Sequence, residues 1–106
     1  SNKVKAIYDY TCQICGVKIT LPAGSYAEGC HIKPLGRPHN GPDTLHNILC
    51  LCPNCNVEFD NGVFYIDGEY VIHSRKDNSN LRRLTVEAEH LINPEYFAYH
   101  RQMHEE

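Results

Sequence analysis

The chain is predicted to form a small α+β domain, because short strand-like and helix-like segments alternate along its 106 residues. A chain of this length makes one domain with a hydrophobic core of limited size. Hydrophobic residues are 42% and charged residues 22% of the sequence, as is usual for a globular protein. Six cysteines are present, and a metal held by some of them would stabilise so small a core.

The N-terminal half of the chain contains a candidate hairpin and a candidate loop. Residues 3–10 are expected to form a short helix or an extended arm that leads into the first pair of cysteines. Residues 16–29 indicate a hairpin, since apolar and polar residues alternate before a Pro-Ala-Gly turn at 22–24. Residues 34–44 hold three prolines and two glycines, so we expect an ordered loop there.

The next segments are expected to supply a strand, a short helix and another hairpin. The apolar run at residues 47–51 suits a buried strand, and residues 54–60 suit one or two helical turns. Residues 62–74 indicate a second hairpin around Asp67-Gly68, a dipeptide that is favoured in two-residue turns. Residues 75–83 are polar and basic.

A C-terminal helix is expected to begin at Asn93-Pro94, because asparagine is a favoured N-cap and proline a favoured first helical residue. The aromatic face of this helix would contain Tyr96, Phe97, Tyr99 and His100. The expected organisation is therefore a single domain over residues 1–106. It would comprise a core at about 8–61, a hairpin at about 62–74, and a basic linker with the C-terminal helix at 75–106.

Charge and hydropathy exclude some classes of protein. The net charge is −3, so any nucleic-acid partner would have to be bound by a local basic patch. No apolar run approaches the roughly 20 residues that cross a membrane. The first residues, SNKVKAIYDY, lack the apolar core of a signal peptide, and the absence of an initial methionine suggests a piece of a longer protein. We therefore expect a cytoplasmic protein whose cysteines bind metal rather than form disulfides.

Four of the cysteines form two C-x-x-C pairs, Cys12 with Cys15 and Cys52 with Cys55. This spacing allows two thiolates of one tight turn to bind the same ion, and two such pairs make a closed, structural Zn²⁺ site. Buried free thiols are the alternative, and a redox dithiol is disfavoured because no thioredoxin-like pattern surrounds either pair. Cys50 alternates with leucines and is expected in the core of its strand.

The long segment between the cysteine pairs contains His31 and Asn47, and Asn56 directly follows the second pair. In this setting the three residues resemble the motif of the HNH endonucleases, whose fold is the ββα-metal or His-Me finger fold. Similarity to the HNH domain of modification-dependent restriction endonucleases extends over the run CHIKPLGRPHNGPDTLHNILCLCPNCNVEFDNGVF. The resemblance covers about residues 8–74. It implies a ββα-metal core with a Cys₄ structural zinc site, an extra β-hairpin and a C-terminal helix.

The resemblance also implies a role for each residue of the motif. His31 would be the general base, since a neutral imidazole with a pKa of about 6.5 can take a proton from water near neutral pH. Asn47 would hold the loop and orient His31. Asn56 would present its carbonyl oxygen to a catalytic divalent cation, either Mg²⁺, Mn²⁺ or another divalent transition metal.

Cys30 stands where the family often has an aspartate or histidine that shares the catalytic metal. A thiolate suits softer ions better than Mg²⁺. Cys30 is therefore either a ligand that selects a softer metal or a packing residue, with water in the ligand position, or a cause of reduced activity. The packing interpretation is favoured, because some members of the similar subgroup carry a small residue at this position.

The implied substrate is DNA, contacted through its backbone. Residues proposed to make these contacts follow His31 or form a later basic cluster: Lys33, Arg37, His39, Arg75, Lys76, Arg82 and Arg83. The alternative for the later cluster is an ordinary solvated face. His46 could contact phosphate or metal, and Asp43 could orient a loop group, although a turn-capping role is favoured for Asp43.

Partners and competing functions follow from the same residues. The resemblance implies an SRA-like recognition domain N-terminal to this chain in the full-length protein. A homodimer is a further expectation, because one site per chain cuts one strand. The alternative function is a non-catalytic, zinc-stabilised DNA-binding module. A zinc deaminase is excluded, since the H-x-E and P-C-x-x-C signatures are not met at His31 and Cys52.

Overall fold

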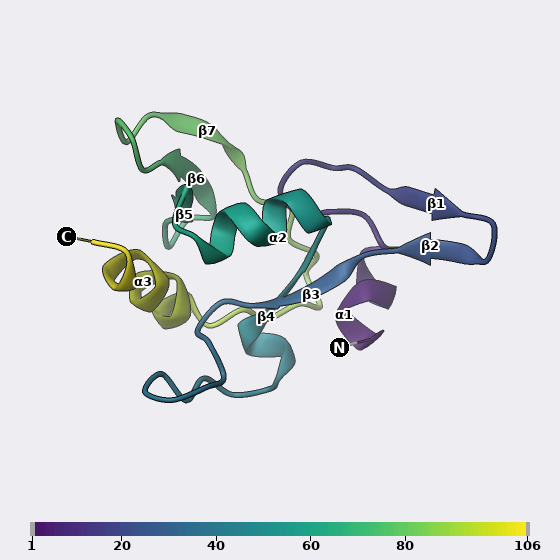
Figure 1. The fold of residues 1–106 in the computed structure, drawn as a ribbon, viewed down its shortest axis with the longest axis horizontal. Coiled ribbons are helices and arrows are strands. Elements are labelled where there is room, and N and C mark those ends of the chain that lie inside the picture. The colour runs from purple at the N-terminus through teal and green to yellow at the C-terminus, as the bar shows by residue number, and fades with distance from the viewer. Residues whose placement is uncertain (1, 106) are drawn as a thin grey trace.

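The computed structural model describes residues 2–105, which form three α-helices and three small antiparallel sheets (Figure 1). This arrangement confirms the predicted α+β class. The N-terminal segment is a helix, α1 (Asn2–Ile7), and so follows the first of the two alternatives for that segment. Within the described residues, no helix is both long and apolar enough to span a bilayer.

The first sheet is the predicted hairpin, β1 (Ile19–Leu21) paired with β2 (Gly24–Tyr26). Leu21 lies opposite Gly24, so the turn contains only residues 22 and 23, and Gly24 belongs to the second strand rather than to the turn. The hairpin extends from the body of the molecule, as Figure 1 shows.

The second sheet and the helix that follows it form a ββα unit. Strand β3 (Glu28–His31) pairs antiparallel with β4 (Ile48–Leu51). A long loop and the short 3₁₀ helix η1 (Leu45–Asn47) connect the two strands. Helix α2 (Pro53–Asp60) follows β4 at once, with proline at its first turn. The predicted buried strand, ordered loop and short helix are all confirmed, with shifts of one residue at the ends.

The third sheet corrects the expectation for residues 75–83. The predicted hairpin is present as β5 (Phe64–Ile66) and β6 (Val71–Ser74), but β7 (Asn80–Arg83) adds a third strand to its edge. The basic segment is therefore not only a linker. All four residues of β7 are exposed, so hydrogen bonding to β6 and not burial of a hydrophobic face fixes this strand.

Helix α3 (Pro94–Met103) begins where the sequence predicts. The side chain of Asn93 accepts a hydrogen bond from the backbone N–H of Glu95 at 3.0 Å, as an N-cap does. Phe97 and His100 are buried, and α3 packs beside β5 (Figure 1).

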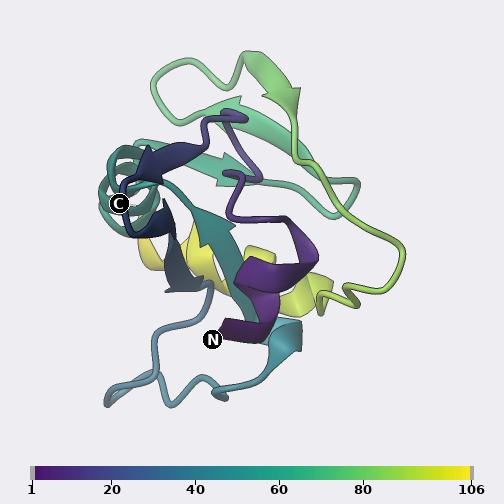
Figure 2. The same cartoon turned by 90° about the vertical axis from the view of Figure 1, so that its right-hand side faces the viewer.

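The hydrophobic core lies on both faces of β4. Leu49 and Leu51 belong to the main core cluster, whereas Ile48 and Cys50 belong to a second cluster that includes residues of α1. Figure 2 shows α1 beside β4, on the side of that strand away from α2. Cys50 is fully buried, which agrees with its predicted place in the core.

Gln13 bridges three segments of the chain. Its backbone N–H donates to the carbonyl of Cys50 at 2.9 Å, and its side-chain oxygen accepts from the N–H of Cys50 at 2.9 Å. On its other side it exchanges two hydrogen bonds with Thr85, at 2.8 and 3.0 Å. Gln13 is buried, with only 1% of its surface exposed, and these four bonds satisfy its buried polar groups.

His100 is expected to make stability depend on pH. Its ring stacks on Phe59 and its Nε2–H donates to the Phe59 carbonyl at 2.7 Å; burial lowers its pKa from 6.5 to about 4. Because the unfolded chain gains this proton near pH 6.5 and the folded chain does not, the free energy of unfolding should fall by about 3 kcal/mol between pH 6.5 and 4. Urea denaturation at pH 7, 6 and 5 measures this slope, and His100→Phe should flatten it. Equal slopes in the two proteins would contradict the assignment.

Candidate active site and zinc site

The four cysteines of the two C-x-x-C pairs lie together, with all four sulfur atoms within 4.8 Å of one another. A tetrahedral zinc site with Zn–S bonds of about 2.3 Å requires sulfurs about 3.8 Å apart. The Sγ atoms of Cys15 and Cys52 are 3.7 Å apart, which matches this spacing, and the other sulfurs lie within 4.8 Å, close enough to bind one ion after small adjustments. The cluster is compatible with the predicted structural metal site.

Each C-x-x-C pair forms a tight turn of the same kind, called a knuckle below. The N–H of Cys15 points to Sγ of Cys12 at 3.5 Å, and the N–H of Cys55 points to Sγ of Cys52 at 3.5 Å. The first knuckle continues into Gly16, whose φ of +79° suits a residue without Cβ. In the second knuckle Cys52 is the N-cap of α2, so the cluster fixes where this helix begins.

His31 ends β3 and meets a carboxylate from the loop. Its Nε2 lies 2.9 Å from Oδ1 of Asp43, and the His31 side chain is 25% exposed. The hydrogen bond from His31 holds the pKa of the exposed Asp43 carboxyl below its usual value. Asp43 therefore orients the predicted base; the favoured expectation that it caps a turn was wrong.

Asn47 closes the base of the loop that connects β3 to β4. Its side-chain oxygen accepts from the N–H of Lys33 at 2.8 Å, and its Nδ2 donates to the carbonyls of Lys33 and Pro42, both at 2.9 Å. Asn47 is fully buried. A Cβ at Gly41 would come within 2.9 Å of the Asn47 amide and clash with the Lys33 carbonyl, so only glycine allows this closure. These bonds agree with the loop-holding role predicted for Asn47.

Asn56 lies one turn into α2 and is held by Glu28. Its Nδ2 donates to Oε1 of Glu28 at 2.8 Å, and Tyr26 donates to the other oxygen at 2.7 Å. The hydrogen bonds from Asn56 and Tyr26 lower the pKa of Glu28, which stays an acceptor. The amide orientation is therefore determined, and Oδ1 of Asn56 is left buried, with no hydrogen-bond partner in the part of the chain that the structure describes.

Cys30 and Asp60 form a second contact between β3 and α2. The Cys30 thiol donates to Oδ1 of Asp60 at 3.5 Å. Burial and the neighbouring Asp60 charge raise the pKa of Cys30 well above its usual value, so the thiol is protonated. Cys30 is 3% exposed, and these contacts favour the packing interpretation over a thiolate ligand.

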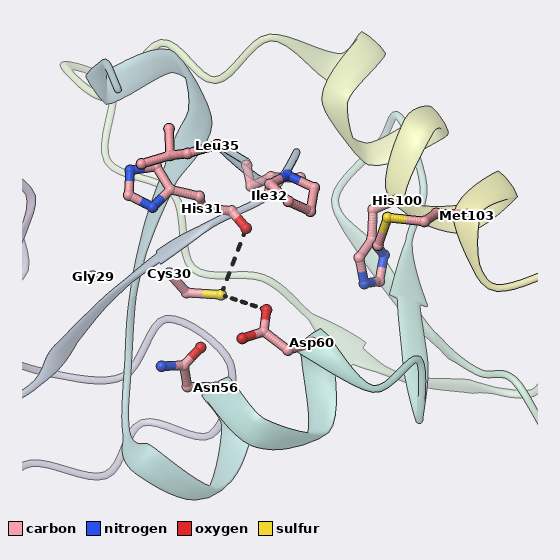
Figure 3. Close-up of a pocket in the computed structure, with 10 residues that line it drawn as sticks. Gly29, Cys30, His31, Ile32, Leu35, Asn56, Asp60, His100 and Met103 are labelled. Carbon is pink, nitrogen blue, oxygen red and sulfur yellow. Dashed lines mark hydrogen bonds between the residues drawn. The ribbon is translucent and has the colours of Figure 1, made fainter. Parts of the chain in front are cut away.

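The contacts of Glu28 with Asn56 and of Cys30 with Asp60 form together because the spacing of the two residues along β3 nearly equals that of their partners along α2. Two residues along a strand advance about 6.6 Å and four residues along a helix about 6 Å. Glu28 and Cys30 therefore face Asn56 and Asp60 in register. Figure 3 shows the Asn56 oxygen and the Asp60 carboxylate projecting from α2 toward the Cys30 sulfur.

A pocket of about 460 Å³ opens at this place, between β3, α2 and α3. Its lining includes His31, Cys30, Asn56 and Asp60, together with His100 and Met103 from α3. The pocket thus joins the predicted base and the predicted metal ligand. Partial burial raises the pKa of Asp60, although the residue as a whole is exposed at the pocket mouth.

The predicted DNA contacts divide into two groups. Lys33, Arg37 and His39 lie in the loop that follows His31, and Arg37 is exposed. The later cluster lies around β7, at the opposite end of the molecule from this loop (Figures 1 and 2). In that cluster the side chain of Arg75 donates to the carbonyl of Gly62 at 3.0 Å, and that of Arg82 to the carbonyl of Ile14 at 2.8 Å. Lys76 and Arg83 are exposed.

Two residues of the site, Glu28 and Asp60, were not predicted, and Asp43 was named as an orienting group only as the less favoured alternative. Asp60 had a signal in the sequence, since it follows Asn56 by four residues and so lies on the same helix face. Glu28 had a weaker one, as the residue two before Cys30 in a strand. The Nδ1–H of His46 donates to the Leu91 carbonyl at 2.6 Å, and so His46 contacts the C-terminal segment.

Two antiparallel strands and a helix, with a histidine, an asparagine and a carboxylate around one pocket, define a nuclease domain of the ββα-metal class. The chain belongs to the HNH endonuclease family, whose sequence profile matches residues 12–67. It is similar to a solved structure of a modification-dependent TagI restriction endonuclease, with 40% identity and a TM-score of 0.92. That match covers 95% of this chain but 35% of the other, so this chain spans about a third of the restriction enzyme's length.

A second relative is Anaredoxin from Nostoc sp., which is 29% identical over 66 residues. That alignment covers 62% of this chain and 78% of Anaredoxin.

Proposed function

We propose that this domain is a metal-dependent DNA endonuclease that hydrolyses phosphodiester bonds with His31 as its general base. The observation that carries the proposal is the side-chain oxygen of Asn56. It is buried, has no hydrogen-bond partner among residues 2–105, and is directed by Glu28 into the pocket that His31 also lines. An unpartnered buried acceptor beside a carboxylate is what a hard divalent cation requires.

His31 is oriented to act as a base. Because the Asp43 carboxylate accepts the Nε2–H of His31, the ring is held as the tautomer with a lone pair on Nδ1. That nitrogen can take a proton from a water molecule as the water attacks the scissile phosphate. Asp43 would also stabilise the imidazolium that results.

The metal would be held by Asn56 Oδ1 and the Asp60 carboxylate, with water completing its coordination. Amide and carboxylate oxygens suit Mg²⁺ and Mn²⁺ better than softer ions. When bound, such an ion neutralises charge on the phosphate and on the leaving oxygen. Cys30 would keep its proton and position Asp60 through their hydrogen bond.

The similar restriction endonuclease supports DNA as the substrate and a larger parent enzyme as the context. We propose that residues 1–106 are one nuclease unit that works with an SRA-like recognition domain, and that two copies cut the two strands. Lys33 and Arg37, in the loop beside His31, would contact the DNA backbone. Such contacts give binding that weakens as salt rises and carries no sequence information.

Cleavage of supercoiled plasmid tests the proposal, with Mg²⁺, Mn²⁺, Co²⁺ or Ni²⁺ supplied separately. Asn56→Ala should raise the metal concentration needed for half-maximal cleavage by about tenfold or more, because an oxygen ligand is lost. The matched control is Asn54→Ala, which removes an exposed asparagine from the same helix and should leave this concentration unchanged. If none of these metals supports cleavage while DNA binding is retained, the result would instead support the non-catalytic zinc-stabilised module.

A further inference from the structure

We propose that Tyr99 of α3 is a positioning residue for cleavage, because it holds the loop that carries Asp43 to His31. The inference rests on the proposed function. It concerns residues 33–43, which leave the end of β3 and return to η1. Figure 1 shows this loop below α3, at the edge of the molecule.

The tip of the loop is bonded to Tyr99 through His39. Nδ1 of His39 lies 2.6 Å from the Tyr99 hydroxyl, and the two rings meet edge-on with centroids 5.6 Å apart. The backbone N–H of His39 in turn donates to the carbonyl of Gly36 at 2.9 Å, which closes a tight turn at the tip. A bond to Tyr99 therefore fixes the turn and not only one side chain.

The start of the loop contacts the same ring. The ammonium of Lys33 lies 4.5 Å from the centroid of Tyr99, within the range of a cation–π interaction. One aromatic side chain thus holds both Lys33, two residues after the base, and His39 at the tip.

Asn47 holds the two ends of the loop together, independently of Tyr99. Its amide bonds Lys33 and Pro42, and Asp43 is the next residue. The Asp43 side chain is 70% exposed, and its one side-chain hydrogen bond among the described residues is to His31. Little burial therefore supports Asp43, and its position depends on the loop being fixed at the base by Asn47 and at the tip by Tyr99.

Tyr99→Phe tests this role, since it removes the hydroxyl but keeps the ring under Lys33. We expect the single-turnover cleavage rate to fall about fivefold, the value of roughly one hydrogen bond, while the apparent KM for DNA stays unchanged. Tyr96→Phe is the matched control. It removes a hydroxyl from the same helix, and this hydroxyl makes no hydrogen bond among the described residues, so the variant should cleave like the unaltered chain.

The effect should depend on Asp43. In a chain that already carries Asp43→Asn, adding Tyr99→Phe should lower the rate no further, because both changes disturb the same contact. A second fivefold loss in that background would show that Tyr99 acts on stability or on DNA directly, and would overturn the inference. An unchanged rate in Tyr99→Phe alone would overturn it as well.

Hydrogen exchange gives a readout that needs no cleavage. Tyr99→Phe should speed amide exchange at residues 39–41, whose N–H groups are bonded within the loop, and leave β3 and β4 unchanged. If the unaltered chain does not cleave, the proposed function fails, and faster exchange still establishes the anchor. Unchanged exchange overturns the inference whatever the cleavage result.

Discussion

Replacement of His31 by alanine is expected to lower the single-turnover rate of plasmid cleavage by about 10²–10⁴-fold, the usual contribution of a general base. The imidazole is partly exposed in the pocket and held by Asp43, so it is positioned to take a proton from water there. The proposed metal ligands Asn56 and Asp60 are left in place. The dependence of the residual rate on metal concentration should therefore remain as in the unaltered chain.

A second histidine–carboxylate pair provides the control. His73 and Asp67 form a pair of the same kind, with Nε2 and Oδ2 at 2.8 Å, on the sheet of β5 and β6. His73→Ala should keep the cleavage rate once its folded state is verified by thermal unfolding. Equal cleavage by His31→Ala and the unaltered chain would exclude His31 as the base.

Loss of the zinc site is expected to unfold the domain. Binding of structural zinc contributes on the order of 10 kcal/mol in small zinc domains, which is comparable to the whole stability of a chain this size. Cys55→Ala removes one ligand from a cluster that caps α2 and joins two distant knuckles. Circular dichroism should show loss of the fold in this variant, and metal analysis should find less than the one zinc per chain expected for the unaltered protein.

Cys50→Ala is the matched control, because Cys50 is a buried cysteine outside the cluster. It should keep one zinc per chain and lose only about 1 kcal/mol of stability, the cost of a small cavity. A folded Cys55→Ala protein with full zinc content would show that the four cysteines do not form the site.

The parts of the fold that follow from local sequence were predictable. The C-x-x-C spacings, the Asn93-Pro94 start of α3 and the hairpin near Asp67-Gly68 each depend on a few adjacent residues. The turn of that hairpin is longer than the expected two residues, because Asp67 bonds to Val71 and Tyr70 takes the positive φ of 68°. Strand β7 could not be predicted in this way, since its residues Asn80–Arg83 do not alternate and are all exposed. Its partner β6 determines it, and that pairing is not visible in the segment itself.

In the candidate site, too, some residues were predictable from the sequence and others depend on how the chain packs. The family motif identified His31, Asn47 and Asn56. The residues that orient them are brought close only when the chain folds. Asp43 reaches His31 only because Asn47 folds the loop back, which no spacing in the sequence reveals. Glu28 and Asp60 depend on the register between β3 and α2, which the sequence leaves open until the two elements are packed.

The Gln13 bridge bears on how far the chain can be shortened and still fold. Shortening the chain to the residues of the ββα unit would remove Thr85 and leave two buried polar groups of Gln13 without partners, at a cost of about 1–3 kcal/mol for each group. Gln13 lies between Cys12 and Cys15, so this penalty falls inside the zinc knuckle. Trimmed versions that end before Thr85 should therefore fail as independent units, although every motif residue is retained.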